Sequence, residues 1–186
     1  MDEEIRRKIL ALLEQHRIMT VATLRPDGWP QATTVGYVNE GLTLYFLCGL
    51  DSQKAKNLAR DNRLSLAIDH DTADLMTITG LSMAAHAHAV HDRAEAEKVL
   101  RMLPLKYPEA QPLPMKMPSP DEVRIFRATP SVISVLDYTK GFGHVTMPPM
   151  HLCQVKSDLP LLTNYEILIA TRAEELAAGF QDDRPG

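Results

Sequence analysis

The chain has 186 residues, of which 45% are hydrophobic, and a formal net charge of −4. This length suits one compact domain, whose core can bury about 70% of the unfolded chain's surface without a disulfide. The mild negative charge argues against a nucleic-acid partner, since dedicated nucleic-acid binders carry a basic stripe.

Two isolated cysteines, Cys48 and Cys153, provide neither a disulfide framework nor a zinc-binding pair. They favour reduced thiols in a cytoplasmic protein. The N-terminal residues lack an apolar signal region, and every apolar stretch is shorter than the roughly 20 residues that cross a bilayer. We therefore expect a cytoplasmic protein with no membrane partner.

In chain order, the first expected element is an amphipathic helix over residues 3–16, where apolar residues recur at helical spacing. Three strands rich in β-branched residues follow, separated by turns that contain glycine. Their expected ranges are 18–24, 31–38 and 42–49. These three strands predict a meander.

The second half of the barrel region alternates helices and strands. Its expected helices cover 52–62 and 93–103, and its expected strands cover 64–69, 76–90, 122–129 and 131–137. Pro130 separates the last two strands, and six prolines between 104 and 120 predict a surface loop. The order of elements indicates an α+β fold with an antiparallel sheet that closes into a barrel, flanked by short helices.

The segment SQKAKNL at residues 52–58 begins a helix directly after an apolar strand. The first N–H groups of a helix have no internal partner, and the helix dipole favours an anion there. Lys54 in the first turn opposes that dipole, and a bound phosphate would remove the conflict. The alternative is an N-cap at Ser52 with a solvated lysine.

An ordered series of segments resembles the FMN-binding split-barrel superfamily of pyridoxamine 5'-phosphate oxidase-like proteins. The series consists of IMTVATLRPDGWPQATTVGYV at 18–38, SQKAKNL at 52–58 and GLSMAAHAHAVHD at 80–92. The resemblance covers residues 5–138. It implies an antiparallel split β-barrel that forms a homodimer and holds FMN in a groove between the subunits.

The resemblance also implies roles for individual residues. The flavin ring would be lined from two strands and the phosphate held at the start of the helix, with Thr33 and Thr34 as candidate donors to the ring. The expected cofactor-binding residues are Gln31, Ala32, Thr33, Thr34, Phe46, Leu47, Ser52, Gln53, Lys54 and Asn57, with Lys56 as a possible assistant to the phosphate.

The segment DYTKGFGH at residues 137–144 adds a second part of the expected site. Glycines permit close backbone approach to a ligand, and similar endings occur in split-barrel flavoproteins. Lys140 and Phe142 would border the flavin, with His144 as a candidate proton donor; a plain strand-exit loop is the alternative. No acid, base or nucleophile stands out, so the catalytic residues, the electron donor and the small-molecule substrate are not identified.

The chain departs from true pyridoxamine phosphate oxidases at two places. Gln53 replaces the arginine of their phosphate cluster, and the C-terminal segment lacks their Trp and Arg pattern. The resemblance therefore implies an FMN-dependent oxidoreductase outside vitamin B6 oxidation. The alternatives are a deazaflavin- or haem-binding split-barrel protein and a non-catalytic flavin-binding protein.

Two further expectations concern metal and assembly. His86 and His88 share a strand face, but a third ligand is not assured, so no metal site is expected. Apolar strand faces around Ile78, Met83 and Val90 are expected to be covered by a second copy. The expected domains are a flavin-binding barrel at 1–140 and an extension at 141–186 that packs on it.

Overall fold

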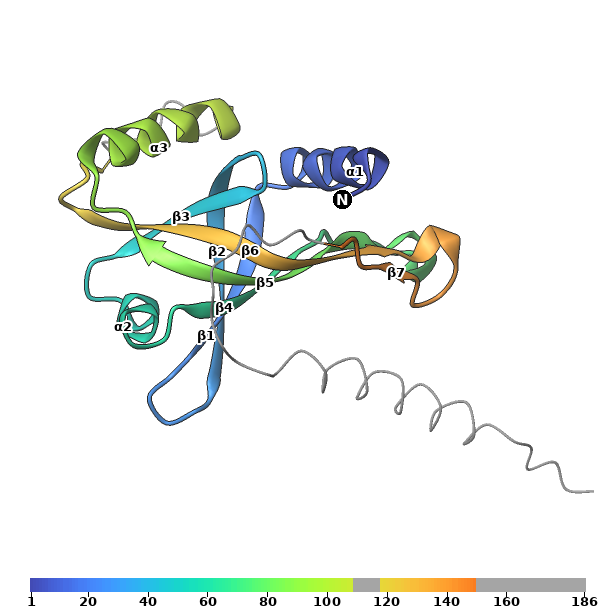
Figure 1. Cartoon of the computed structure of the whole chain (residues 1–186), viewed down its shortest axis with the longest axis horizontal. Helices are drawn as coiled ribbons and strands as arrows, with labels where there is room; N and C mark the ends of the chain where they lie inside the picture. The colour runs from blue at the N-terminus through green and yellow to red at the C-terminus, as the bar shows by residue number, and fades with distance from the viewer. Residues whose placement is uncertain (109–117, 150–186) are drawn as a thin grey trace, which may run out of the picture. The chain divides into compact units, whose positions relative to one another are not determined.

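Six antiparallel strands form a closed barrel in the computed structural model, which describes residues 1–108 and 118–149. The strands are β1 Ile18–Leu24, β2 Pro30–Glu40, β3 Thr43–Gly49, β4 Arg63–Ile68, β5 Thr79–Ala89 and β6 Val123–Asp137. They are ordered β3-β2-β1-β4-β5-β6, and β3 also pairs with β6, which closes the ring (Figure 1). A short strand, β7 Val145–Thr146, extends the sheet beyond β6. The expected split-barrel fold is confirmed.

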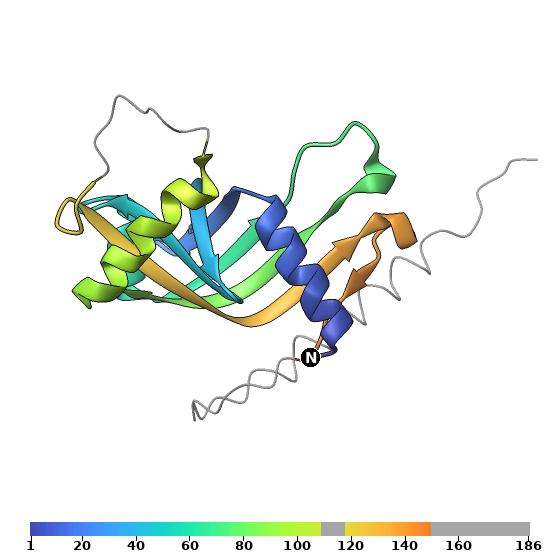
Figure 2. The same cartoon turned by 90° about the horizontal axis from the view of Figure 1, so that it is seen from above.

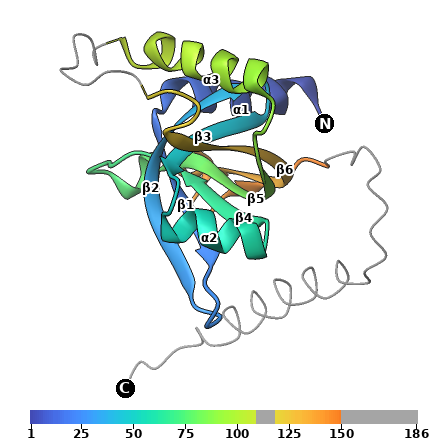
Figure 3. The ribbon, with the colours of Figure 1, turned by 90° about the vertical axis from the view of Figure 1, so that its left-hand side faces the viewer.

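Three helices surround the barrel: α1 Glu3–Gln15, α2 Gln53–Arg60 and α3 Arg93–Lys106. Apolar side chains of α1 and α2 enter the main core, which includes Leu13 and Leu58. A second, smaller core lies between α3 and strands β2, β3 and β6. In Figures 1 and 3, α2 and α3 lie on opposite sides of the strands, and Figure 2 shows α1 and α3 over the curved sheet.

The strands form because their side chains alternate between the core and the outside. On β5, Leu81, Met83 and Ala85 are buried, whereas the residues between them are exposed. Met83 therefore belongs to the core, and the expectation that it lies on an open apolar face is wrong. Ile78 and Val90 are half-buried, and Val90 packs against the second core.

Prolines account for two differences from the expected elements. The helix α3 continues through Pro104 to Lys106, because a proline in the last turn removes only one intrahelical hydrogen bond. Pro130 lies inside one continuous strand, β6, instead of separating two strands. It pairs with Ala85 where the β5–β6 register shifts, and at such an irregularity a missing N–H is tolerated.

The expected strand over 76–90 begins later, at Thr79. A 3₁₀ helix, η1 Leu75–Thr77, precedes it, and the Asp74 side chain caps η1 by accepting from the N–H of Met76. A second 3₁₀ helix, η3 Tyr138–Lys140, follows β6. Residues 150–186, most of the expected C-terminal extension, lie outside the described residues.

The barrel is split along β2. The strand pairs with β1 over Pro30–Gly36 but with β3 only over Tyr37–Glu40. Beyond Phe46, β3 turns to pair with β6 alone. Among the described residues, the first half of β2 therefore has no strand partner on its β3 side, and this open edge lies near α2.

Candidate functional site

The start of α2 combines a capped helix end with a cation that has no partner. Ser52 is the N-cap, and its Oγ accepts from the N–H of Ala55 at 3.2 Å. The first turn holds no acidic residue. Lys54 is half-buried and has neither a hydrogen bond nor an ion pair with a described residue. Its charge faces the positive end of the helix dipole, an arrangement that an anion would stabilise.

The nearest acid after α2 is already paired. Asp61 accepts from Arg63 at 2.6 Å and 3.0 Å. This hydrogen bonding holds the pKa of the Asp61 carboxyl at about 2, well below its ordinary value. Asp61 is therefore an anion committed to Arg63 at the far end of α2 from Lys54.

Asn57 serves a structural role that the sequence did not reveal. It is 1% exposed, and its Nδ2 donates to Thr23 Oγ1 at 3.0 Å and to Gln31 Oε1 at 3.2 Å. Its Oδ1 accepts from Gln53 Nε2 at 2.9 Å. Both donors of Asn57 are used within the protein, so the expected assistance to a phosphate is not available from this amide. Instead, Asn57 fastens α2 to β1 and β2.

The four expected lining residues of β2 divide between the two faces of the strand. Gln31 and Thr33 point toward the barrel side, whereas Ala32 and Thr34 are exposed on the outer face. Thr33 Oγ1 is buried and has no hydrogen-bond partner among the described residues. A buried hydroxyl without a partner is costly, and a ligand donor or acceptor would satisfy it.

The expected contribution of β3 is limited by burial. Phe46 is fully buried and stacks on Phe126 with ring centroids 5.5 Å apart. Its ring belongs to the core, so only its backbone can border a ligand. Leu47 is half-buried against the second core, which also limits its contact with a ligand.

The loop after β6 lies at the other end of the sheet. Gly141 and Gly143 have φ of 130° and 73°, which glycine adopts without strain, and they return the chain to pair β7 with β6. Phe142 is 79% exposed and contacts Tyr138 edge to face. Lys140 is also exposed, and His144 is half-buried beside Thr146.

Within one chain, this loop and the start of α2 do not meet. Asp137, just before the loop, pairs with Thr79 at the first residue of β5. The α2 segment lies near the last residues of β5, since Ala87 donates to the carbonyl of Asn62. A strand rises about 3.3 Å per residue, so the two ends of β5 are separated by about 30 Å. Lys140 and Phe142 of one copy can therefore lie beside Lys54 only if Lys54 belongs to another copy.

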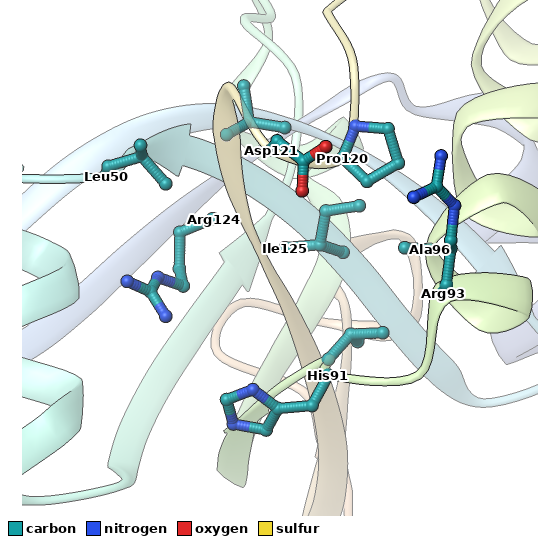
Figure 4. A pocket seen from close by; sticks show the side chains of 10 residues that line it. Leu50, His91, Arg93, Ala96, Pro120, Asp121, Arg124 and Ile125 are labelled. Carbon is teal, nitrogen blue, oxygen red and sulfur yellow. The ribbon is translucent and has the colours of Figure 1, made fainter.

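Sequence reasoning also missed a cleft of about 510 Å³ beside α2. It is lined by Lys56 of α2, His88 of β5 and Arg124 of β6 above an apolar floor that includes Phe126. A smaller cleft of about 270 Å³ lies across β6, between that strand and α3 (Figure 4). Of the residues expected at the cofactor site, only Lys56, the possible assistant to the phosphate, lines the larger cleft, and none lines the smaller one. No local pattern in the sequence signals this cleft, because its basic residues come from three separate elements of the chain.

His86 and His88 share the outer face of β5, as expected. Asn62 bridges them: His86 Nδ1 lies 3.3 Å from its Oδ1, and His88 Nε2 lies 3.4 Å from its Nδ2. The described part of the chain holds no group of three or more His, Cys, Asp or Glu side chains placed to bind a metal ion. In the same part of the chain, no helix is both long and apolar enough to cross a membrane.

The antiparallel barrel is closed, is split along β2 and has a lysine in the first turn of its flanking helix α2. These features define a split-barrel protein of the α+β class. The family model described as pyridoxamine 5'-phosphate oxidase matches residues 5–137. The chain belongs to this family. A search of curated proteins finds no match.

Solved structures share this fold. A putative pyridoxamine 5'-phosphate oxidase from Listeria innocua is 22% identical with a TM-score of 0.59, over 72% of this chain and 98% of that one. A conserved hypothetical protein from Mycobacterium tuberculosis is 26% identical with a TM-score of 0.63, over 80% and 93%. A heme-binding protein from Mycobacterium smegmatis is 20% identical with a TM-score of 0.60, over 77% and 55%.

Proposed function

We propose that this protein binds FMN between two copies of the chain and acts as a flavin-dependent oxidoreductase. The observation that carries the proposal is Lys54, a half-buried cation in the first turn of α2 that pairs with none of the described residues. An FMN molecule has two parts with opposite needs. Its phosphate requires cations and N–H donors, and its ring requires a flat surface with a few polar groups.

The residues present fit both parts. The free N–H groups of α2, the Ser52 hydroxyl and Lys54 suit a phosphate. The unpaired backbone groups of β2 and the unsatisfied Thr33 hydroxyl suit the polar edge of a flavin ring. When bound, FMN supplies hydride or single-electron transfer. The protein's own residues bind the phosphate, orient the ring and cover it from water.

The outer face of the sheet supports a paired arrangement. Small side chains form two rows that cross the strands in register. One row contains Ala32, Ala22, Ser65 and Ala84, and the next contains Thr34, Thr20, Ala67, Ser82 and Ser134. All these side chains are exposed or half-buried. A surface of small side chains lets a second copy approach closely.

Such a dimer would also bring the two parts of the expected site together. Ala32 and Thr34 lie at the β2 end of this surface, next to the open edge. The loop with Lys140 and Phe142 lies at the far end of β5 in the same chain. Its exposed aromatic ring is available to cover a ligand held by a partner.

The proposal is tested by titrating FMN into the protein and following the loss of FMN fluorescence. The variant Lys54→Ala removes the unpaired cation and should raise the Kd at least tenfold, about 1.4 kcal/mol. Lys98→Ala is the matched control. It removes the same charge from α3, where Lys98 forms an exposed ion pair with Glu40 of β2. The control should bind FMN within about twofold of the unchanged protein.

Equal FMN affinity in the Lys54→Ala variant and the control would remove Lys54 from the phosphate site. Parallel titrations with a deazaflavin cofactor and with haem separate the alternatives. A preference for deazaflavin would replace FMN with that cofactor. A sharp Soret band on addition of haem, without FMN binding, would indicate that the protein binds haem, as the name of the Mycobacterium smegmatis protein says of that protein.

A further inference from the structure

The larger cleft gathers basic side chains from three elements of the fold and the loop after β5. Lys56 comes from α2, Arg124 from the start of β6, and His88 and His91 from the end of β5 and the loop after it. None of the four forms an ion pair with a described residue; the only described contact among their side chains is that of His88 with Asn62. Asp51 is the single acid in the lining.

The rest of the lining is mostly apolar. The floor is formed by Ala59, Ala87 and Phe126, and Phe126 is itself 3% exposed and belongs to the main core. The volume of about 510 Å³ falls in the range of small-molecule sites. A positive rim over an apolar floor suits a molecule with an anionic group at one end and an apolar body at the other.

Arg124 is placed to orient such a ligand. Arg124 is half-buried, and it pairs with Cys48 of β3 where β3 and β6 close the barrel. This strand pairing fixes the position of its backbone. In Figure 4, Arg124 and His91 extend to one side of the β6 ribbon, whereas Arg93 and Ala96 lie on the other. A guanidinium recognises phosphate and carboxylate groups through paired N–H donors, so Arg124 supplies geometry as well as charge.

The cleft is separate from the start of α2, where FMN is proposed to bind. A helix turns about 100° per residue, so Lys54 and Lys56 project about 160° apart around α2. Lys54 lies on the side of Asn57, which contacts β1 and β2. Lys56 lies on the side of Ala59, which lines the cleft. One helix thus presents its two lysines to two different surfaces.

We infer that this cleft is a second binding site, for a small anion with an apolar body, and that Lys56 and Arg124 hold its anionic group. The ligand's body rests on Phe126 and the neighbouring alanines. This inference does not depend on FMN binding, since the proposed FMN phosphate site is formed by Ser52 and Lys54, and neither of them lines the cleft.

The probe for this site is phenyl phosphate, which joins a phosphate to an aromatic ring. It is titrated into the ¹⁵N-labelled full-length chain and followed by NMR. We expect saturable binding, with the largest shifts at the amides of Ala59 and Ala87. Inorganic phosphate and phenol, which each supply one half of the probe, should bind at least tenfold more weakly.

Variants then locate the binding. Lys56→Ala, an exposed change that leaves the core intact, should weaken phenyl phosphate at least fivefold, and Arg124→Gln at least tenfold, with spectra that otherwise overlay those of the unchanged chain. Lys98→Ala, which removes a lysine outside the lining of the cleft, should leave the Kd within about twofold. If Lys54→Ala weakens the probe and Lys56→Ala does not, the anion binds at the start of α2 and the inference is wrong. Equal binding of inorganic phosphate would also overturn it, because the apolar floor would then contribute nothing.

Discussion

The role of Asn57 gives the sharpest test of how the site is built. The variant Asn57→Ala removes hydrogen bonds to Thr23 and Gln31, at 3.0 Å and 3.2 Å. Thr23 is 2% exposed, and leaving a buried polar group without a partner costs about 1–3 kcal/mol. Gln31 is half-buried and adds a smaller cost, while exposed Gln53 exchanges its bond for water. We therefore expect a loss of about 2–4 kcal/mol in the free energy of unfolding.

The assay is equilibrium unfolding in urea, followed by circular dichroism, with Gln53→Ala as the control. Gln53 contributes only the bond to Asn57 Oδ1 and is exposed, so its replacement should cost less than about 1 kcal/mol. If Asn57 instead binds the phosphate directly, Asn57→Ala should weaken FMN binding without lowering the free energy of unfolding. A weaker FMN affinity for Asn57→Ala with unchanged stability would refute the structural account of this residue.

Three further predictions concern the framework around the site. Gly80→Ala should destabilise the fold by more than about 2 kcal/mol in urea unfolding, because its Cβ would lie 2.6 Å from the carbonyl oxygen of Ile68. Tyr107→Phe should cost about 1–3 kcal/mol by the same measurement, since the hydroxyl accepts from the N–H of Tyr37 at 2.7 Å. Hydrogen bonding from Lys8 holds the pKa of Asp137 below its ordinary value of 3.8, so the ionised carboxylate stabilises the fold above that pH. Its contribution should be lost as the pH falls below 3.8, and Asp137→Asn should flatten this part of the stability profile.

The strands and helices could be predicted because their local chemistry agrees with the fold. On β5, the alternation from Leu81 to Ala89 follows the period of a half-buried strand, and Ser52 marks the start of α2 by capping it. Turn residues such as Gly28 and Gly41 take positive φ where the sequence placed turns. The ordered series of these elements was enough to indicate the family.

Pro104 and Pro130 were misleading because the free-energy cost of a proline depends on its position in the helix or on the pairing with the partner strand. Pro130 reads locally as a break, but it occupies a shifted position in the β5–β6 ladder, which only the pairing with Ala85 reveals. Pro104 reads as the start of a loop, but it falls in the last turn of α3. Pro130 occupies a position where the ladder is already irregular, and Pro104 interrupts α3 only two residues before its end.

The composition of the candidate site was harder to predict because burial is a tertiary property. Nothing local distinguishes Phe46, which packs on Phe126 from across the barrel seam, from a residue that faces a ligand. Asn57 similarly reads as a surface amide until Thr23 and Gln31 are brought beside it. The basic cleft, built from three elements, is invisible before the chain closes.

The most direct test of the central claim is sedimentation velocity of the full chain with FMN, recorded at 280 nm for protein and 450 nm for flavin. The account predicts a single protein boundary at twice the mass of the chain, with the flavin signal moving at the same rate. Flavin that stays behind as the free molecule, or protein that sediments as a monomer whether or not FMN is present, would contradict a flavin site formed between two copies.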